Sequence, residues 1–134
     1  MRTKFAAFAV VVGVIGGAGS AIAHHSFAAE FDANKALTLK GVVTKIEWQN
    51  PHTYFYMDVS QADGKVVNWG MEMGSPNGLM RQGWTRNTLK IGDVVTVEGS
   101  QAKDGTNVGN ARVVILDATG QRLFAASSQS GTAR

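Results

Sequence analysis

The chain has 134 residues, no cysteine, and 13 Lys and Arg against 10 Asp and Glu. This length suits one small domain rather than several. Without cysteine the chain cannot form a disulfide framework, a thiolate nucleophile or a thiolate metal site, so a hydrophobic core must hold the fold.

The first 23 residues have the pattern of a cleavable signal peptide. Arg2 and Lys4 supply positive charge, and an apolar run follows over residues 5–15. The segment ends in Ala21-Ile22-Ala23, an A-x-A cleavage signature. An uncleaved anchor is the alternative, but the apolar run falls short of the about 20 residues that span a bilayer. We therefore expect a periplasmic or secreted protein that begins at His24 and has no membrane span after cleavage.

Cleavage after Ala23 also changes the charge balance. The signal peptide contains two basic residues and no acidic one, so the mature chain keeps eleven basic and ten acidic residues, a formal charge of +1. A nucleic-acid partner favours a basic groove, which this balance does not indicate. We expect a small ligand or a metal ion as the partner and no nucleic acid.

The mature chain divides by composition into an arm over residues 24–36, a domain over 37–125 and a Ser/Gly-rich tail over 126–134. We expect the tail to be disordered. The first strand-like segment, residues 37–48, changes the parity of its apolar positions near Thr44-Lys45, which indicates a β-bulge. Further strand-like segments lie at residues 52–59, 66–73, 94–98, 111–116 and 122–124.

A helical signal interrupts the strands. Ser75 and Pro76 predict an N-cap and a first helical residue, and Gly83 predicts the stop behind Arg81 or Gln82. Three strands, a short helix and then further strands predict an all-β, OB-fold-like Greek-key barrel of five to six strands. A plain six-stranded barrel or a sandwich is the alternative.

No sequence motif indicates an enzyme. The chain has no G-x-S-x-G elbow, no P-loop and no dinucleotide fingerprint, and its acidic residues form no recognisable acid–base pair. We therefore predict no catalytic residues and expect an exported, non-enzymatic binding protein.

The three histidines suggest a metal site. After cleavage, His24 carries both a free amine and an imidazole, His25 adds a second imidazole, and His52 begins the second strand. Such nitrogen ligands suit Cu(II), and the set resembles the histidine brace of copper proteins with an N-terminal histidine. The alternative is that His24 and His25 form a solvated chain start while His52 caps a strand. Copper is the cofactor that this pattern favours, although the ligand chemistry does not separate it from zinc or nickel.

A second metal hypothesis uses Trp69, Met71 and Met73, because thioethers select Cu(I). This stretch resembles small periplasmic copper chaperones of the OB fold, which bind Cu(I) through His, two Met and a nearby Trp. Here the Trp-to-Met spacing is one residue shorter, and strand alternation places both methionines on the core face. Core packing by methionine is the commoner use.

An aromatic face offers an alternative function. Tyr54 and Tyr56 share one face of the second strand with His52, and such a surface on an OB barrel often binds extended ligands. A peptide or small organic ligand is then expected, with the protein as a binding or adaptor module. The competing interpretation is that the two tyrosines cover the barrel and pack against Phe27 or Phe31.

The chain also resembles a family of small exported bacterial proteins known as a domain of unknown function. The similarity covers roughly residues 24–124 and implies periplasmic export and a small β-barrel, without an activity. The residues that carry it are His24-His25-Ser26-Phe27, Phe31-Asp32, Asn50-Pro51-His52, Trp69, Glu72, Gly74-Ser75-Pro76-Asn77, Gly83-Trp84 and Gly92-Asp93-Val94-Val95.

These residues are densest around the loop at 74–77. A ligand site there would use side chains on and around the loop, and the alternative is a helix entry fixed by capping and tryptophan packing. The candidate ligand-binding residues are Tyr54, Tyr56, Trp69, Glu72, Ser75, Asn77 and Trp84.

Overall fold

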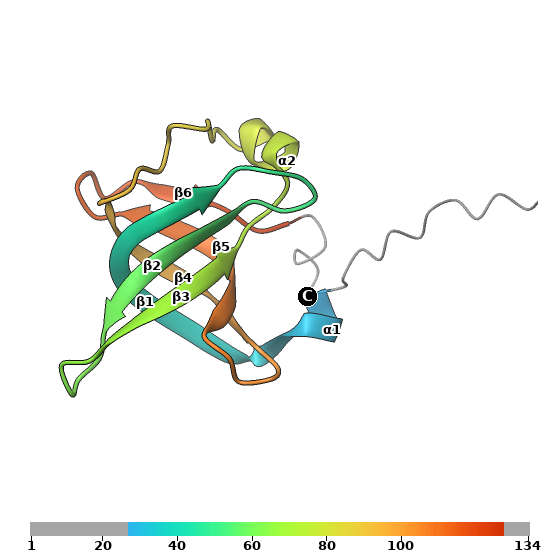
Figure 1. The fold of residues 1–134 in the computed structure, drawn as a ribbon. Helices are drawn as coiled ribbons and strands as arrows, with labels where there is room; N and C mark the ends of the chain where they lie inside the picture. The colour runs from blue at the N-terminus through green and yellow to red at the C-terminus, as the bar shows by residue number, and fades with distance from the viewer. Residues whose placement is uncertain (1–26, 128–134) are drawn as a thin grey trace, which may run out of the picture.

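The computed structural model describes residues 27–127, which form six strands and two short helices (Figure 1). No helix in this described part is long and apolar enough to cross a membrane. In chain order the elements are α1 (Phe27–Glu30), β1 (Phe31–Glu47), β2 (Tyr54–Ser60), β3 (Val66–Glu72), α2 (Pro76–Arg81), β4 (Val94–Ala102), β5 (Val108–Leu116) and β6 (Arg122–Phe124).

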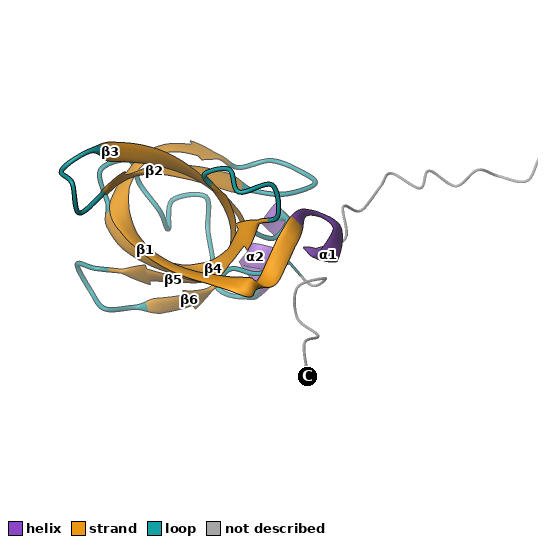
Figure 2. Ribbon diagram, turned by 90° about the horizontal axis from the view of Figure 1, so that it is seen from below, coloured by secondary structure: helices purple, strands orange, loops and turns teal. Residues whose placement is uncertain are grey.

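The strands form one sheet that closes on itself. Its order is β3-β2-β1-β4-β5-β6, and a parallel pairing of β3 with β5, from Gly70↔Val108 to Glu72↔Asn110, completes the ring. Figure 2 shows this ring of strands with its enclosed interior. Because α2 connects β3 to β4 and the remaining pairings are antiparallel, the predicted OB-fold-like barrel is confirmed.

The first strand is longer than the sequence predicts. β1 pairs with both β2 and β4, and its register shifts between Val43 and Lys45, which confirms the predicted bulge. It begins at Phe31 rather than at Leu37, so residues 31–36, which the sequence assigns to the arm, extend this strand. Phe31 is buried and pairs with Ala102, whereas residues 33–36 are exposed and hide the strand pattern.

The alternation predicted for the second strand is confirmed. Phe55 and Met57 are fully buried, while Tyr54 and Tyr56 on the opposite face are half-buried. The strand itself starts at Tyr54, two residues after His52. The pairing nevertheless continues beyond it, since the Thr53 N–H donates to the Gly74 carbonyl and the Met73 N–H donates to the Thr53 carbonyl.

The helix α2 forms as its capping residues predict. The Ser75 hydroxyl accepts a hydrogen bond from the Gly78 N–H at 3.2 Å, Pro76 is the first helical residue, and Gly83 has a φ of 93° behind the C-cap. Leu79 is fully buried in the core. The helix therefore covers one end of the barrel (Figure 1).

The end of the described chain packs on the barrel. The Gly74 N–H donates to the Ala125 carbonyl at 2.9 Å, and Ala126 is 2 % exposed. Ala126, the first residue of the expected tail, is thus buried next to a backbone hydrogen bond that joins Ala125 to the helix entry, and residues 128–134 lie outside the described part.

The hairpin of β4 and β5 depends on one glycine. The register shifts between Glu98 and Gly99, and a Cβ on Gly99 would lie 1.9 Å from the carbonyl oxygen of Asn110. No side chain fits in that space, so the two strands approach here only because residue 99 is glycine.

Candidate functional site

His52 lies two residues before β2 and next to Thr53, which is hydrogen-bonded to Gly74 just before α2, and 16 % of its side chain is exposed. Its Nδ1 is 3.1 Å from the Met73 carbonyl oxygen. A carbonyl only accepts hydrogen bonds, so in the neutral ring Nδ1 carries the proton and Nε2 carries the lone pair. His24 and His25 lie outside the described residues, so the site shared by three histidines stays a prediction.

Glu72 and Tyr54 lie beside His52. They are paired across β3 and β2, and the Tyr54 hydroxyl donates to Glu72 Oε2. Glu72 Oε1 is 3.8 Å from His52 Nδ1, and the side chain of Glu72 is 7 % exposed. Burial raises the pKa of Tyr54 first, and the hydrogen bond and negative charge of Glu72 raise it further. The structure therefore brings together three of the predicted residues: His52, Tyr54 and Glu72.

Tyr56 belongs to a separate group on the same face. Its hydroxyl donates to Glu47 Oε2 at 3.2 Å, and Lys45 Nζ lies 5.2 Å from its ring centroid. Burial raises the pKa of Tyr56, as does the hydrogen bond to Glu47. Lys45 lies 2.6 Å from the Glu47 carboxylate and lowers the pKa of that carboxyl. The two tyrosines therefore pair with different acids, and the ring of Phe27 packs against that of Phe31.

Three of the remaining four candidates make structural contacts. Ser75 caps α2, and Asn77 is exposed on that helix. Trp84 is 2 % exposed and donates from Nε1 to the Phe124 carbonyl at 2.9 Å. Trp69 is half-buried against the core. The structure therefore agrees with the interpretation of residues 74–77 as a helix entry fixed by capping and tryptophan packing.

The thioether hypothesis fails on burial. Met71 is 0 % exposed and Met73 is 1 % exposed, and both belong to the hydrophobic core. Sulfur ligands pointing into a packed core cannot reach a metal at the barrel surface. These methionines fill the core, as the strand alternation predicts.

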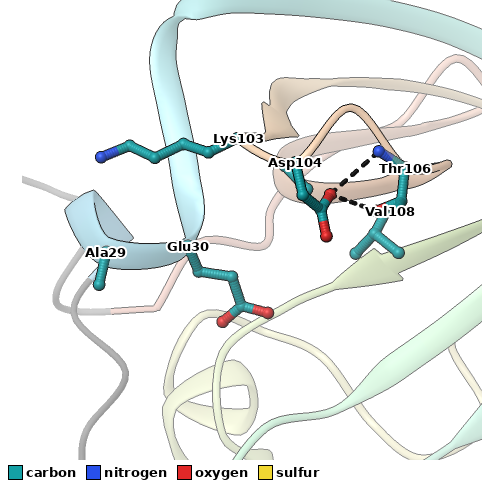
Figure 3. Close-up of a pocket in the computed structure, with 7 residues that line it drawn as sticks. Ala29, Glu30, Lys103, Asp104, Thr106 and Val108 are labelled. Atoms are coloured by element: carbon teal, nitrogen blue, oxygen red, sulfur yellow. Dashed lines mark hydrogen bonds between the residues drawn. The ribbon is translucent and has the colours of Figure 1, made fainter.

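Two surface pockets have linings that do not include His52, Tyr54 or Glu72. One, of about 360 Å³, is lined by Glu30, Lys103, Asp104 and their neighbours (Figure 3), and another of about 220 Å³ is lined by Lys90, Asp93 and neighbouring residues. In Figure 3 the Lys103 ammonium extends toward α1, where it donates to the Ala28 carbonyl, and Asp104 is bonded to Thr106. Lys103 and Asp104 in the first pocket and Asp93 in the second already have local hydrogen-bond partners, and we assign no ligand to either pocket.

Sequence reasoning missed the acceptor that orients His52. That acceptor is the backbone carbonyl of Met73, which no side-chain pattern can identify. The Tyr54–Glu72 pair could in principle be predicted, because both residues were candidates and lie on neighbouring strands. Predicting that they pair requires the register of β2 against β3. Between residues 27 and 127, the structure brings together no group of three His, Asp or Glu side chains able to hold a metal ion.

A search of curated proteins found no match to this chain. Residues 11–111 match the profile of the Family of unknown function (DUF6152). The match covers most of the chain, including α1, β1, β2, β3, α2, β4 and the start of β5. The chain therefore belongs to this family of unknown function.

Proposed function

We propose that the mature protein is an exported, non-enzymatic β-barrel that binds Cu(II) through His52 together with His24 and His25. One observation carries the proposal: the Nδ1 of His52 is 3.1 Å from the Met73 carbonyl oxygen. Histidines that bind metals nearly always donate their other ring N–H to a carbonyl or carboxylate, which fixes the ring and its tautomer. The Nδ1 edge of His52 has such a carbonyl partner, which leaves Nε2 for a metal ion.

The charge around His52 supports a cation. Glu72 brings a carboxylate to within 3.8 Å of Nδ1, at a place where little solvent screens it. His52 and Glu72 alone do not make a metal site, because residues 27–127 contain no cluster of three such ligands. The proposal therefore requires the amine and imidazole of His24 and the imidazole of His25.

The contacts of Glu30 and Phe31 with the barrel support the proposal that His24 and His25 act as ligands. The Lys103 N–H donates to the Glu30 carbonyl at 2.9 Å, and Phe31 is buried. His24 precedes Phe27 by three residues, so their Cα atoms are at most about 11 Å apart. Glu30 is also near enough to Tyr54 for its charge to raise that pKa. The proposed amine ligand is thus tethered a short distance from a fixed point on the barrel.

The test is a Cu(II) titration of protein that begins at His24, confirmed by mass. We expect His52→Ala to weaken binding about tenfold or more, and one alanine added before His24 to weaken it similarly by removing the free amine as a chelating group. Gln49→Ala, at an exposed position in the same loop, is the matched control and should change nothing. Equal affinity in all four proteins would refute the copper site.

The alternative of a peptide or small-organic adaptor has less support. The hydroxyls of Tyr54 and Tyr56 already donate to Glu72 and Glu47, so they have no hydrogen left to donate to a polar ligand. A ligand would have to donate to these hydroxyls or bind the ring faces, one of which already has Lys45 above it. We therefore prefer copper.

A further inference from the structure

An exposed apolar region lies at the start of β4, whereas α1 lies beside the other end of that strand (Figure 1). Val42 on β1 and Val94 on β4 are paired across the two strands, and both are exposed. Their neighbours Val43 and Val95 are buried inside, so the first pair lies on the outer face of the barrel. Ile91, in the turn before β4, is 70 % exposed. Such a group of exposed apolar side chains indicates a surface that another molecule covers.

The turn that carries Ile91 has a fixed shape. The Asp93 N–H donates to the Lys90 carbonyl at 3.1 Å, and the Lys90 N–H donates to Asp93 Oδ2 at 2.9 Å. Gly92 has a φ of 93°, and its N–H donates to the Val43 carbonyl at 2.8 Å, which ties the turn to β1. The backbone of a side chain held in this way loses little further freedom when another molecule covers it.

A pocket lies beside this turn. It has a volume of about 220 Å³, and its lining includes both ends of the turn, Lys90 and Asp93. The apolar part of the lining comes from Val94, Leu116 and Ala118. Ile91 itself does not line the pocket. An engineered cavity of about 150 Å³ accommodates benzene, so a pocket of this size has room for an isoleucine side chain.

We propose that two copies of the chain pair through this face, with Ile91 of each copy inserted into the pocket of the other. The exposed isoleucine and the pocket lie side by side, which makes the face complementary to itself. A two-fold rotation then brings each Ile91 opposite the pocket of the second copy, and the pair closes without leaving a free site. The paired valines, Val42 and Val94, add apolar surface next to this contact.

The charges at the pocket also suit a second copy. Lys90 makes no ion pair with any residue between 27 and 127, and Asp93 carries the opposite charge. A face that has one cation and one anion beside its apolar part is complementary in charge to itself, which adds to specificity. The pairing does not involve His52 and does not depend on the proposed copper function.

The test is the mass of the protein in solution at increasing concentration, measured by sedimentation equilibrium on protein with the N-terminus that the cell gives it. We expect the mass to rise from one chain to two and no further. Ile91→Ser removes the inserted side chain and should weaken the pair about 100-fold, since each pair contains the change twice and each contact contributes about tenfold. Met80→Ser is the matched control, because Met80 is also exposed but lies on α2, and it should leave the pairing unchanged.

A second variant tests the pocket without changing Ile91. Ala118→Trp, at an exposed position that lines the pocket, should fill the pocket and weaken the pair as Ile91→Ser does. A pair of one Ile91→Ser chain and one Ala118→Trp chain keeps one of the two contacts. We therefore expect the mixture to associate about tenfold more tightly than either variant alone.

The inference is overturned if the unmodified protein keeps the mass of one chain at every concentration, which would assign this face to a different partner. A mass that grows beyond two chains would contradict the two-fold arrangement. Equal association of Ile91→Ser and Met80→Ser would place the contact elsewhere on the molecule. A mixture no tighter than its separate components would show that Ile91 and the pocket do not meet.

Discussion

At the residue scale, Thr53 places a hydroxyl group in the buried interior of the barrel. Thr53 is fully buried, and its Oγ1 has no hydrogen-bond partner within residues 27–127. Its backbone groups are bonded to Met73 and Gly74, so the strand position itself is well held. The cost therefore comes from one unsatisfied side-chain oxygen.

Valine has nearly the shape of threonine without the hydroxyl. We expect Thr53→Val to raise the free energy of unfolding by about 1 kcal/mol, because it removes a buried polar group without creating a cavity. Urea denaturation measures the change. Thr53→Ala removes the methyl as well and should be less stable than Thr53→Val; a valine variant less stable than the unmodified protein would contradict this account.

Residue types predicted this region only in part. Alternation along β2 placed Phe55 and Met57 inside and the tyrosines outside, because the period of a strand is two. The acidic residue that each tyrosine contacts depends on strand register and on side-chain length. The register cannot be predicted from the local sequence. His52 could be identified as a candidate, but not the carbonyl that orients it.

At the element scale, α2 has six residues and depends on its cap. The Ser75 hydroxyl satisfies the Gly78 N–H, and Pro76 at the first position has no N–H to satisfy. A helix this short gains little from its own hydrogen bonds, so the cap and the burial of Leu79 hold it in place.

We expect Ser75→Ala to lower the free energy of unfolding by about 1 kcal/mol through loss of the cap. Ser75→Asp keeps an acceptor at the N-cap and should retain most of the stability, since a negative charge suits the start of a helix. Thermal unfolding followed by circular dichroism distinguishes them. Equal losses in both variants would show that the hydroxyl acts by something other than capping.

Local sequence predicts the ends of some helices and strands but not of others. The helix was predictable because Ser, Pro and Gly at its ends act through local chemistry. The start of β1 was not, because residues 33–36 have exposed side chains and the register against β4 is irregular between Phe31 and Ala36. A strand extended by a distant partner leaves little local pattern.

At the scale of the whole molecule, the barrel closes through a short ladder between β3 and β5. β3 pairs with β5 only from Gly70 to Glu72, whereas β1 pairs with β4 along most of the length of β4. The Gly70 N–H donates to the Asn107 carbonyl at 3.0 Å, at the edge of this closure. The order of strands was predictable from element order, but the extent of each ladder was not.

Native-state hydrogen exchange should locate the weakest seam of the barrel. We expect the Gly70 amide to exchange through a local opening of lower free energy than the amides of β4 that pair with β1, because fewer neighbouring bonds must break. If Gly70 instead exchanged only with global unfolding, the closure would be as cooperative as the rest of the barrel.

The length of β1 also bears on how fast the chain folds. Leu37 pairs with Gly99, a residue roughly 60 positions later, and this long-range ladder joins the first strand to the fourth. Chains dominated by such distant pairings fold in about milliseconds to seconds, far more slowly than helical bundles. β1 therefore has no main partner until the fourth of the six strands has been synthesised. Exposed lysines discourage an unpaired strand from joining another chain, and β1 has three of them, Lys35, Lys40 and Lys45.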